Sequence, residues 1–94
     1  MIYRVCFSKE FKRQYNKLIY SGNKKTLVEL DKVVDKLSGG EELSEKNFVH
    51  KLKGEFQGCF ECHVLPDWLL IYKIYENVLV LELISTGSHS ELFE

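Results

Sequence analysis

The spacing of apolar residues changes along the chain from a helical period to a strand period. The apolar run 3–7 predicts a first strand, and Ser8 directly after it is typical of a helix N-cap. Apolar positions then recur every three or four residues in two stretches, separated by the turn 21–23 and closed by the glycines at 39–40. The positions that predict the two buried helix faces are Phe11, Tyr15, Leu18 and Ile19, followed by Leu27, Leu30, Val34 and Leu37. The pattern predicts an antiparallel helical hairpin.

In the second half the apolar period is two. Residues 59–65, 68–75 and 78–85 are rich in β-branched and aromatic side chains, and turn pairs at 66–67 and 76–77 separate them. They predict a three-stranded antiparallel meander, preceded by a polar loop or helical turn at 41–47. With the first strand joining this meander, the predicted fold is α+β, in the order β-α-α-β-β-β. The N-terminal strand and the helical hairpin are then packed on an antiparallel sheet.

Length and composition indicate a single small domain over residues 1–94. With 45% hydrophobic residues the chain can bury a core, although a domain of 94 residues is only marginally stable. No apolar run approaches the length of about 18 residues that spans a membrane. Three cysteines are an odd and sparse set, which favours free thiols in a reducing compartment. We therefore expect a cytoplasmic protein without a membrane partner.

The net charge of −1 conceals an uneven distribution of charged residues. Residues 1–36 carry nine Lys or Arg against four Asp or Glu, whereas residues 37–94 carry four against ten. A basic cluster on the two predicted helices can attract a phosphate backbone. Charge alone favours the simpler interpretation, a solvated helix surface that keeps a small protein soluble.

The three histidines lie in three polar junctions beside apolar strands. His50 precedes a glycine-containing loop, His63 lies near the end of the second predicted strand, and His89 follows the last strand. Strand alternation places His63 and Glu61 together, on the face opposite the apolar Cys62, Val64 and Phe60. We expect the three histidines to converge on one site, because histidine is the side chain best suited to move protons near neutral pH.

Metal-free cleavage of RNA is a reaction that such a set of residues fits. It needs a base for the ribose 2′-hydroxyl, an acid for the departing 5′-oxygen, positive charge near the phosphate and a flat surface for a base. Candidates for proton transfer are His50, His63, Asp67, His89 and Glu61, and the candidate stacking surfaces are Trp68 and Phe93. Each also has a structural explanation: a hydrogen-bonded surface histidine, a turn aspartate, a core tryptophan, or a phenylalanine that pins the tail.

A zinc site at the segment Cys59-x-x-Cys62-His63 is the competing chemical interpretation. Strand alternation points the two thiols to opposite faces, so the segment predicts neither a shared metal ion nor a disulfide. We expect no metal and no cofactor.

Three motifs together resemble the YafQ-like branch of the RelE/ParE toxin superfamily. They are His50-x-Leu52-x-Gly54, the segment 58–73 with Glu61-x-His63 and Pro66-Asp67-Trp68, and the segment 86–93 ending in His89-Ser90-Glu91-Leu92-Phe93. The resemblance implies a RelE-like fold and a toxin of a type II toxin–antitoxin system that cuts translated mRNA in the ribosomal A site without a metal. The set His50, His63, Asp67 and His89 is then catalytic, with Glu61 a weaker candidate, and Trp68 and Phe93 contact RNA or support the site.

The resemblance also implies partners. A cognate antitoxin normally wraps such toxins with its C-terminal segment, and operator DNA is bound only as the toxin–antitoxin complex. The acid and the base stay unassigned among the candidates, with His89 or His63 preferred as the acid and Asp67 as an orienting or basic group.

Two departures from the family pattern weaken the expected phosphate contacts. Relatives commonly carry arginine where this chain has Phe60 and Ser85, and a guanidinium binds phosphate bidentately. Lys51, Lys53 and Lys73 are the candidates that compensate. With a pI near 6.3, we expect weaker or more salt-sensitive activity than in a strongly basic relative.

Three alternatives remain at this point. One is a catalytically weakened or inactive relative that acts through antitoxin and operator binding, and the second is a ParE-like gyrase inhibitor, which does not need the histidines. The third is an unrelated regulatory α+β binding module.

Overall fold

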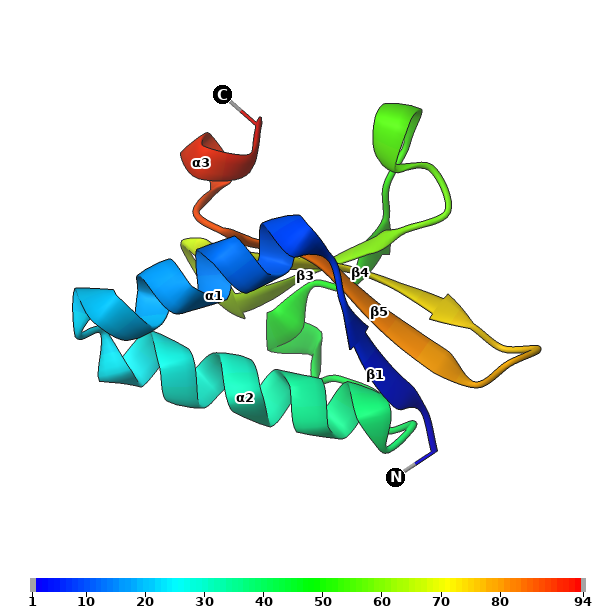
Figure 1. Cartoon of the computed structure of the whole chain (residues 1–94). Coiled ribbons are helices and arrows are strands. Elements are labelled where there is room, and N and C mark those ends of the chain that lie inside the picture. Colours follow the sequence, from blue (N-terminus) through cyan, green and yellow to red (C-terminus); the bar gives the residue numbers. More distant parts are fainter. Residues whose placement is uncertain (1, 94) are drawn as a thin grey trace.

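The computed structural model describes residues 2–93, and Figure 1 shows the arrangement of their helices and strands. In chain order the elements are β1 (Arg4–Phe7), α1 (Lys9–Ser21), α2 (Lys24–Ser38), the 3₁₀ turn η1 (Glu45–Asn47), β2 (His50–Lys51), the 3₁₀ turn η2 (Gly54–Phe56), β3 (Phe60–Leu65), β4 (Trp68–Tyr75), β5 (Val80–Gly87) and α3 (His89–Phe93). The predicted α+β fold, with a strand and helical hairpin ahead of a meander, is confirmed.

The first strand joins the meander as predicted, but its pairing is parallel, and a short edge strand is added that the apolar pattern did not predict. The strand order of the sheet is β1-β5-β4-β3-β2, with β1 parallel to β5 and the other neighbours antiparallel. The two-residue strand β2 adds an edge by pairing His50 with Glu61. The last strand begins at Val80 rather than at residue 78, because Leu79 has a left-handed backbone (φ 52°) and still belongs to the turn.

Local capping explains where the two long helices begin and end. The Ser8 side chain accepts a hydrogen bond from the Phe11 amide at 2.9 Å and donates one to the Ile84 carbonyl at 2.6 Å, so it links α1 to β5. Gly22 closes α1 in the left-handed region (φ 77°), and Asn23 then caps α2. No helix within residues 2–93 has the length and apolar character needed to cross a membrane.

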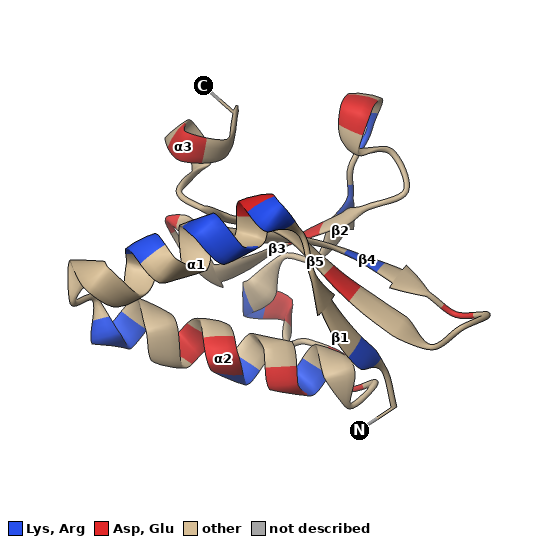
Figure 2. Cartoon of the chain, in the orientation of Figure 1, with Lys and Arg blue, Asp and Glu red and all other residues tan. Residues whose placement is uncertain are grey.

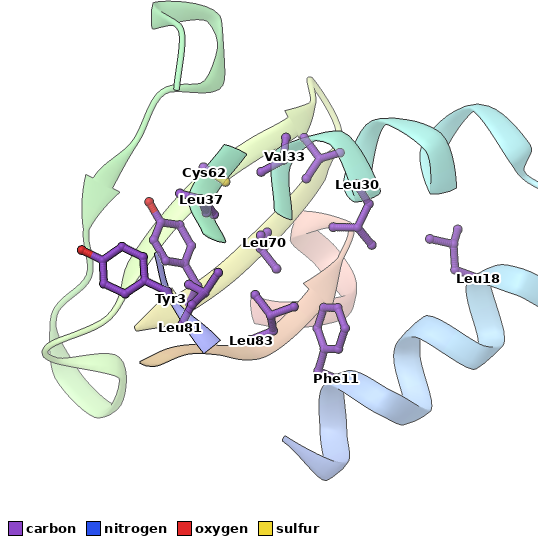
Figure 3. Close-up of a cluster of buried hydrophobic side chains, with 12 residues drawn as sticks. Tyr3, Phe11, Leu18, Leu30, Val33, Leu37, Cys62, Leu70, Leu81 and Leu83 are labelled. Atoms are coloured by element: carbon purple, nitrogen blue, oxygen red, sulfur yellow. The ribbon is translucent and has the colours of Figure 1, made fainter. Parts of the chain in front are cut away.

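The main core lies between the sheet and the two long helices (Figure 3). Leu30 of α2 and Cys62, Leu70 and Leu81 of the sheet are fully buried in it. The predicted face of α2 is confirmed, since Leu30 and Leu37 are buried and Leu27 and Val34 pack against the core as partly buried residues. Val33 and Thr26 are buried in addition. Ile19, predicted as buried, is 45% exposed. The contact stripe of α1 runs through Phe11 and Leu18, and Ile19 is rotated away from that line by one residue step.

Candidate active site

The face of the sheet turned away from α1 and α2 carries Glu61 and His63. In β3 these two side chains alternate with Cys62, which is in the helix-side core. Their neighbours across β4, Ile71 and Leu69, are buried although neither belongs to that core. The predicted alternation is confirmed. Glu61 is nevertheless only 6% exposed, so this face is not open to solvent along its whole length. We call this surface the histidine face.

Two short helical segments flank the histidine face. In Figure 1, α3 and η2 both rise from the side of the sheet away from α2. Their side chains meet, since the rings of Phe56 and Phe93 are in edge contact with centroids 6.1 Å apart. Sequence reasoning had not singled out Phe56. The available signal was an aromatic residue in a loop between Gly54 and Gly58.

His50 and Glu61 form a contact that the sequence did not predict. The two residues are register partners on β2 and β3, and Nε2 of His50 lies 3.3 Å from Oε1 of Glu61. Nδ1 of the same ring lies 2.9 Å from the Phe48 carbonyl oxygen. The Phe48 carbonyl oxygen is an acceptor, so Nδ1 faces it with its hydrogen, while the Glu61 carboxyl group lies at the other ring nitrogen. This arrangement holds His50 at the edge of the histidine face, beside the buried carboxyl group of Glu61.

His63 is held differently, through one ring nitrogen and its own backbone. Its Nδ1 lies 3.3 Å from the Pro66 carbonyl oxygen, an acceptor, so this nitrogen carries the hydrogen and the neutral ring has its lone pair on Nε2. Asn47 fixes the backbone by donating from Nδ2 to the His63 carbonyl oxygen at 2.7 Å. The ring of Phe48 contacts the imidazole edge-on, with centroids 5.5 Å apart. His63 is therefore an oriented side chain with a basic nitrogen.

The position of His89 follows from the strand register. His63 pairs with Leu69 and Leu69 pairs with Gly87, two residues before His89. With strands about 4.8 Å apart, His63 and the end of β5 are separated by about 10 Å at the same level of the sheet. The structure thus brings His63 and the segment that carries His89 to one end of the histidine face. The ring of His89 lies 5.1 Å from that of Phe93, measured between centroids.

Helix α3 is short, and a reciprocal pair of hydrogen bonds fixes its start. The Ser88 side chain accepts from the Glu91 amide at 3.2 Å, and Glu91 Oε1 accepts from the Ser88 amide at 3.0 Å. This amide and the nearby Lys17 lower the pKa of the Glu91 carboxyl group. Sequence reasoning placed His89 after a strand and did not predict this helix.

Asp67 and Trp68 are adjacent in the sequence but have different surroundings. Asp67 is exposed in the β3–β4 turn, beside the Pro66 carbonyl that orients His63. Trp68 packs against the helix-side core, and its indole N–H donates to Thr86 Oγ1 at 2.8 Å. Trp68 therefore lies on the opposite side of the sheet from the histidine face.

The lysines expected to compensate for the absent arginines also separate. Lys51 pairs with Phe60, next to the His50–Glu61 pair, so alternation points it away from the histidine face. Lys53 is exposed in the following loop. Lys73 lies on the histidine face, two residues beyond Ile71, and its Nζ is 5.0 Å from the centroid of the Tyr75 ring. Of the three lysines, Lys73 is the one whose strand position places it on the same face as Glu61 and His63.

Cys59 and Cys62 have different surroundings, as alternation predicted. Cys62 is in the helix-side core, where burial raises the pKa of its thiol to about 12. Cys59 lies outside that core, and burial also raises its pKa. Among residues 2–93, no group of three or more His, Cys, Asp or Glu side chains is placed to hold a metal ion.

Comparisons with known proteins agree with the motifs. Residues 3–94 match the family model described as bacterial toxin of type II toxin-antitoxin system, YafQ. The mRNA interferase toxin YafQ of Escherichia coli K12 is 46% identical over 44 residues, which are 47% of this chain and 46% of that protein. The chain thus aligns with about half the length of this curated relative.

Solved structures extend the similarity to nearly the whole chain. A metal-bound toxin from Helicobacter pylori is 39% identical, with a TM-score of 0.86 over 99% of this chain and 100% of that one. YafQ from E. coli BL21(DE3) has the same fold, with 24% identity and a TM-score of 0.87 over 98% and 99% of the two chains. YafQ from the E. coli DinJ–YafQ toxin–antitoxin complex is also 24% identical, with a TM-score of 0.85 over the full length of both chains. The resemblance read from the motifs is confirmed, and the chain belongs to the YafQ family of bacterial toxins of type II toxin–antitoxin systems.

Proposed function

We propose that this toxin is an endoribonuclease that cuts translated mRNA in the ribosomal A site with its own His and Asp side chains and without a metal. The supporting observation is the register that sets His63 level with the strand end leading to His89, beside the turn that carries Asp67. The E. coli relatives named mRNA interferase toxin YafQ support the same activity.

The proposed chemistry assigns different roles to the two histidines. His63, whose Nδ1 is directed at the Pro66 carbonyl, takes the proton of the ribose 2′-hydroxyl on Nε2. The oxygen then attacks the adjacent phosphorus, and His89 protonates the 5′-oxygen that leaves. Asp67, in the β3–β4 turn, orients the groups that exchange protons. Phe93 supplies a flat surface beside His89 on which a base can stack.

Lys73 supplies positive charge in place of the absent arginines. His50 is paired with Glu61, so we assign it a positioning role at the edge of the site rather than a proton-transfer role. Lys73 is on the histidine face and takes a phosphate oxygen of the transition state. Lys51 and Lys53 contribute to RNA binding from outside that face.

The partners proposed for this chain are a cognate antitoxin, the ribosome and mRNA. The E. coli DinJ–YafQ complex is the observation that supports an antitoxin. Operator DNA is bound only by the toxin–antitoxin complex, and the protein acts in the cytoplasm.

Primer-extension mapping of mRNA in a translating extract tests the proposal. The wild-type protein is compared with a double variant, His89→Ala plus Asp67→Ala, and with a control double variant, Asp35→Ala plus Lys36→Ala, that changes two exposed residues of α2. We expect in-frame cuts from the wild type and the control, and none from the site variant.

A second arm tests the metal-free chemistry, because the H. pylori relative was solved as a metal-bound toxin. Adding 1,10-phenanthroline removes transition metals while leaving Mg²⁺ for the ribosome, and we expect the cuts to persist. Cuts that disappear with this chelator contradict the metal-free mechanism.

A catalytically weakened relative is the second candidate. Ser85 and Phe60 stand where relatives carry arginine, and neither side chain is a cation. Ser85 is buried, and Phe60 stacks on Tyr72 with ring centroids 5.7 Å apart. No cuts from any of the three proteins would overturn the nuclease proposal and leave antitoxin and operator binding. Toxicity that survives the site variant and brings DNA damage would indicate gyrase inhibition.

A further inference from the structure

A cleft of about 420 Å³ lies between α1, the start of β4 and α3, outside the histidine face. Two cations of α1, Arg13 and Lys17, line one wall, and Trp68 and Thr86 line another. Glu91 of α3 also lines it. Figure 2 shows Lys and Arg along much of α1, whereas α2 alternates between basic and acidic residues. The α1 helix itself carries Lys9, Lys12, Arg13 and Lys17 against the single acid Glu10.

The tryptophan wall of this cleft is rigidly built. Thr86 is 1% exposed, and its Oγ1 accepts from the Trp68 indole and donates to the Leu69 carbonyl, both at 2.8 Å. From α1, Gln14 accepts the Thr86 amide on Oε1 at 2.7 Å. These bonds fix the edge of the indole, so its remaining surface is presented in one orientation.

The two cations have only weak carboxylate partners. Arg13 pairs with Glu10 one helical turn earlier, and Lys17 Nζ lies 3.8 Å from Glu91 Oε2. The Arg13 and Lys17 side chains are 62% and 72% exposed, and solvent screens ion pairs that are exposed to this extent. A phosphate group can therefore replace these carboxylates at little cost.

We propose that this cleft binds a phosphodiester of single-stranded RNA, with the phosphate on Arg13 and Lys17 and an adjacent base against Trp68. A cationic groove with an aromatic wall is the general arrangement for binding single strands without sequence preference. This inference deepens the proposed function and rests on it. The cleft is connected to the active site through the chain, because Trp68 follows Asp67 directly and Glu91 shares α3 with His89.

The fluorescence of Trp68 gives a direct test, because it is the only tryptophan of the chain. The full-length protein is titrated with a 2′-O-methyl RNA hexanucleotide, which cannot be cleaved. We expect saturable quenching that weakens several-fold in Arg13→Ala and in Lys17→Ala. Each variant should lower the slope of log affinity against log salt by about 0.7.

Lys32→Ala is the matched control. Lys32 is an exposed helix lysine 3.4 Å from Glu29, in the same i, i+3 relation as Arg13 and Glu10, but on α2. We expect its titration to match the wild type. Co-sedimentation of the same variants with empty small ribosomal subunits distinguishes messenger from ribosomal RNA as the source of the strand.

The outcome separates this inference from the proposed function. His89→Ala should abolish cleavage and keep the quenching, because His89 does not line the cleft. The cleft assignment is overturned if Arg13→Ala and Lys17→Ala behave like Lys32→Ala in both binding assays. This holds even where cleavage is intact. Quenching that depends on both cations, in a protein without cleavage, supports the cleft and contradicts only the nuclease proposal.

Discussion

The two faces of the sheet differ in what their side chains do, although the same strands build both. The helix-side face holds a continuous apolar cluster with fully buried Leu70 and Leu81. The histidine face holds Glu61 and His63, with polar contacts to loops and turns. Because side chains alternate along a strand, neighbouring residues can serve stability and chemistry separately.

This separation explains how a chain of 94 residues can carry a reactive set of side chains. A small domain has little stability to spare, so buried polar groups are tolerated only where each has a partner. Glu61 meets this condition through His50, and Thr86 through Gln14 and Trp68. Within residues 2–93, no buried side-chain nitrogen or oxygen lacks a hydrogen-bond partner.

The largest effect on stability is expected from the helix-side face. Phe11 is 2% exposed in the core, and Phe11→Ala should lower the free energy of unfolding by about 3–5 kcal/mol through lost burial and a cavity. Urea denaturation followed by circular dichroism measures this change. A loss below about 1 kcal/mol would show that the helix-side core does not dominate stability.

His50 tests the division between the two faces of the sheet. It lies on the histidine face but contacts the buried carboxyl group of Glu61. His50→Ala leaves Glu61 without its imidazole partner and should cost about 1–3 kcal/mol of unfolding free energy. His89→Ala, at an exposed position outside the helix-side core, should cost less than His50→Ala. Equal losses in the two variants would contradict the positioning role of His50.

Thr86 tests how firmly the tryptophan wall is held. Thr86→Val keeps the shape of the side chain but removes the acceptor for the Trp68 indole, which should cost about 1 kcal/mol. Gln14→Ala removes the acceptor for the Thr86 amide and is the companion variant. Tryptophan emission should shift in Thr86→Val, and an unchanged spectrum with unchanged stability would rule out the bond as a support.

The cysteines give the smallest expected effect, a difference in reactivity without a change in stability. Burial raises the pKa of Cys62 to about 12, so almost none of it is thiolate at pH 8, and burial also protects Cys59. A thiol reagent should therefore modify only the partly exposed Cys6 of the native protein. Mass spectrometry after brief labelling checks this, and rapid modification of Cys62 would contradict the packing of the helix-side face.

Much of this architecture could be predicted from local pattern, and the missing parts are those that depend on long-range contacts. Ser8, the helical stripes and the alternation around His63 are local signals, and the structure confirms them. The strand β2 has two residues and α3 has five, both too short to leave a periodic signal.

The same limit applied to the candidate site. Strand alternation placed Glu61 with His63 correctly, but the His50–Glu61 pair depends on a strand pairing across a loop. The hydrogen bond from the Trp68 indole to Thr86 joins residues that are eighteen positions apart in the sequence. The sequence indicated only surface charges at Arg13 and Lys17, because the cleft that they line also involves Glu91 of α3, far away in the sequence.

The most direct test of the central claim compares two consecutive residues of β3, His63 and Val64. His63 points to the histidine face, and Val64 is 6% exposed in the helix-side core. Cleavage per folded molecule is measured in the translating extract for His63→Ala and Val64→Ala. The melting temperature of the same two variants is measured by thermal denaturation.

We expect His63→Ala to lose at least about 100-fold in cleavage with little change in melting temperature. Val64→Ala should melt several degrees lower and retain its cleavage per folded molecule. Cleavage that survives in His63→Ala, or that falls equally in both variants, would contradict the division of the sheet into a stabilising face and a catalytic face.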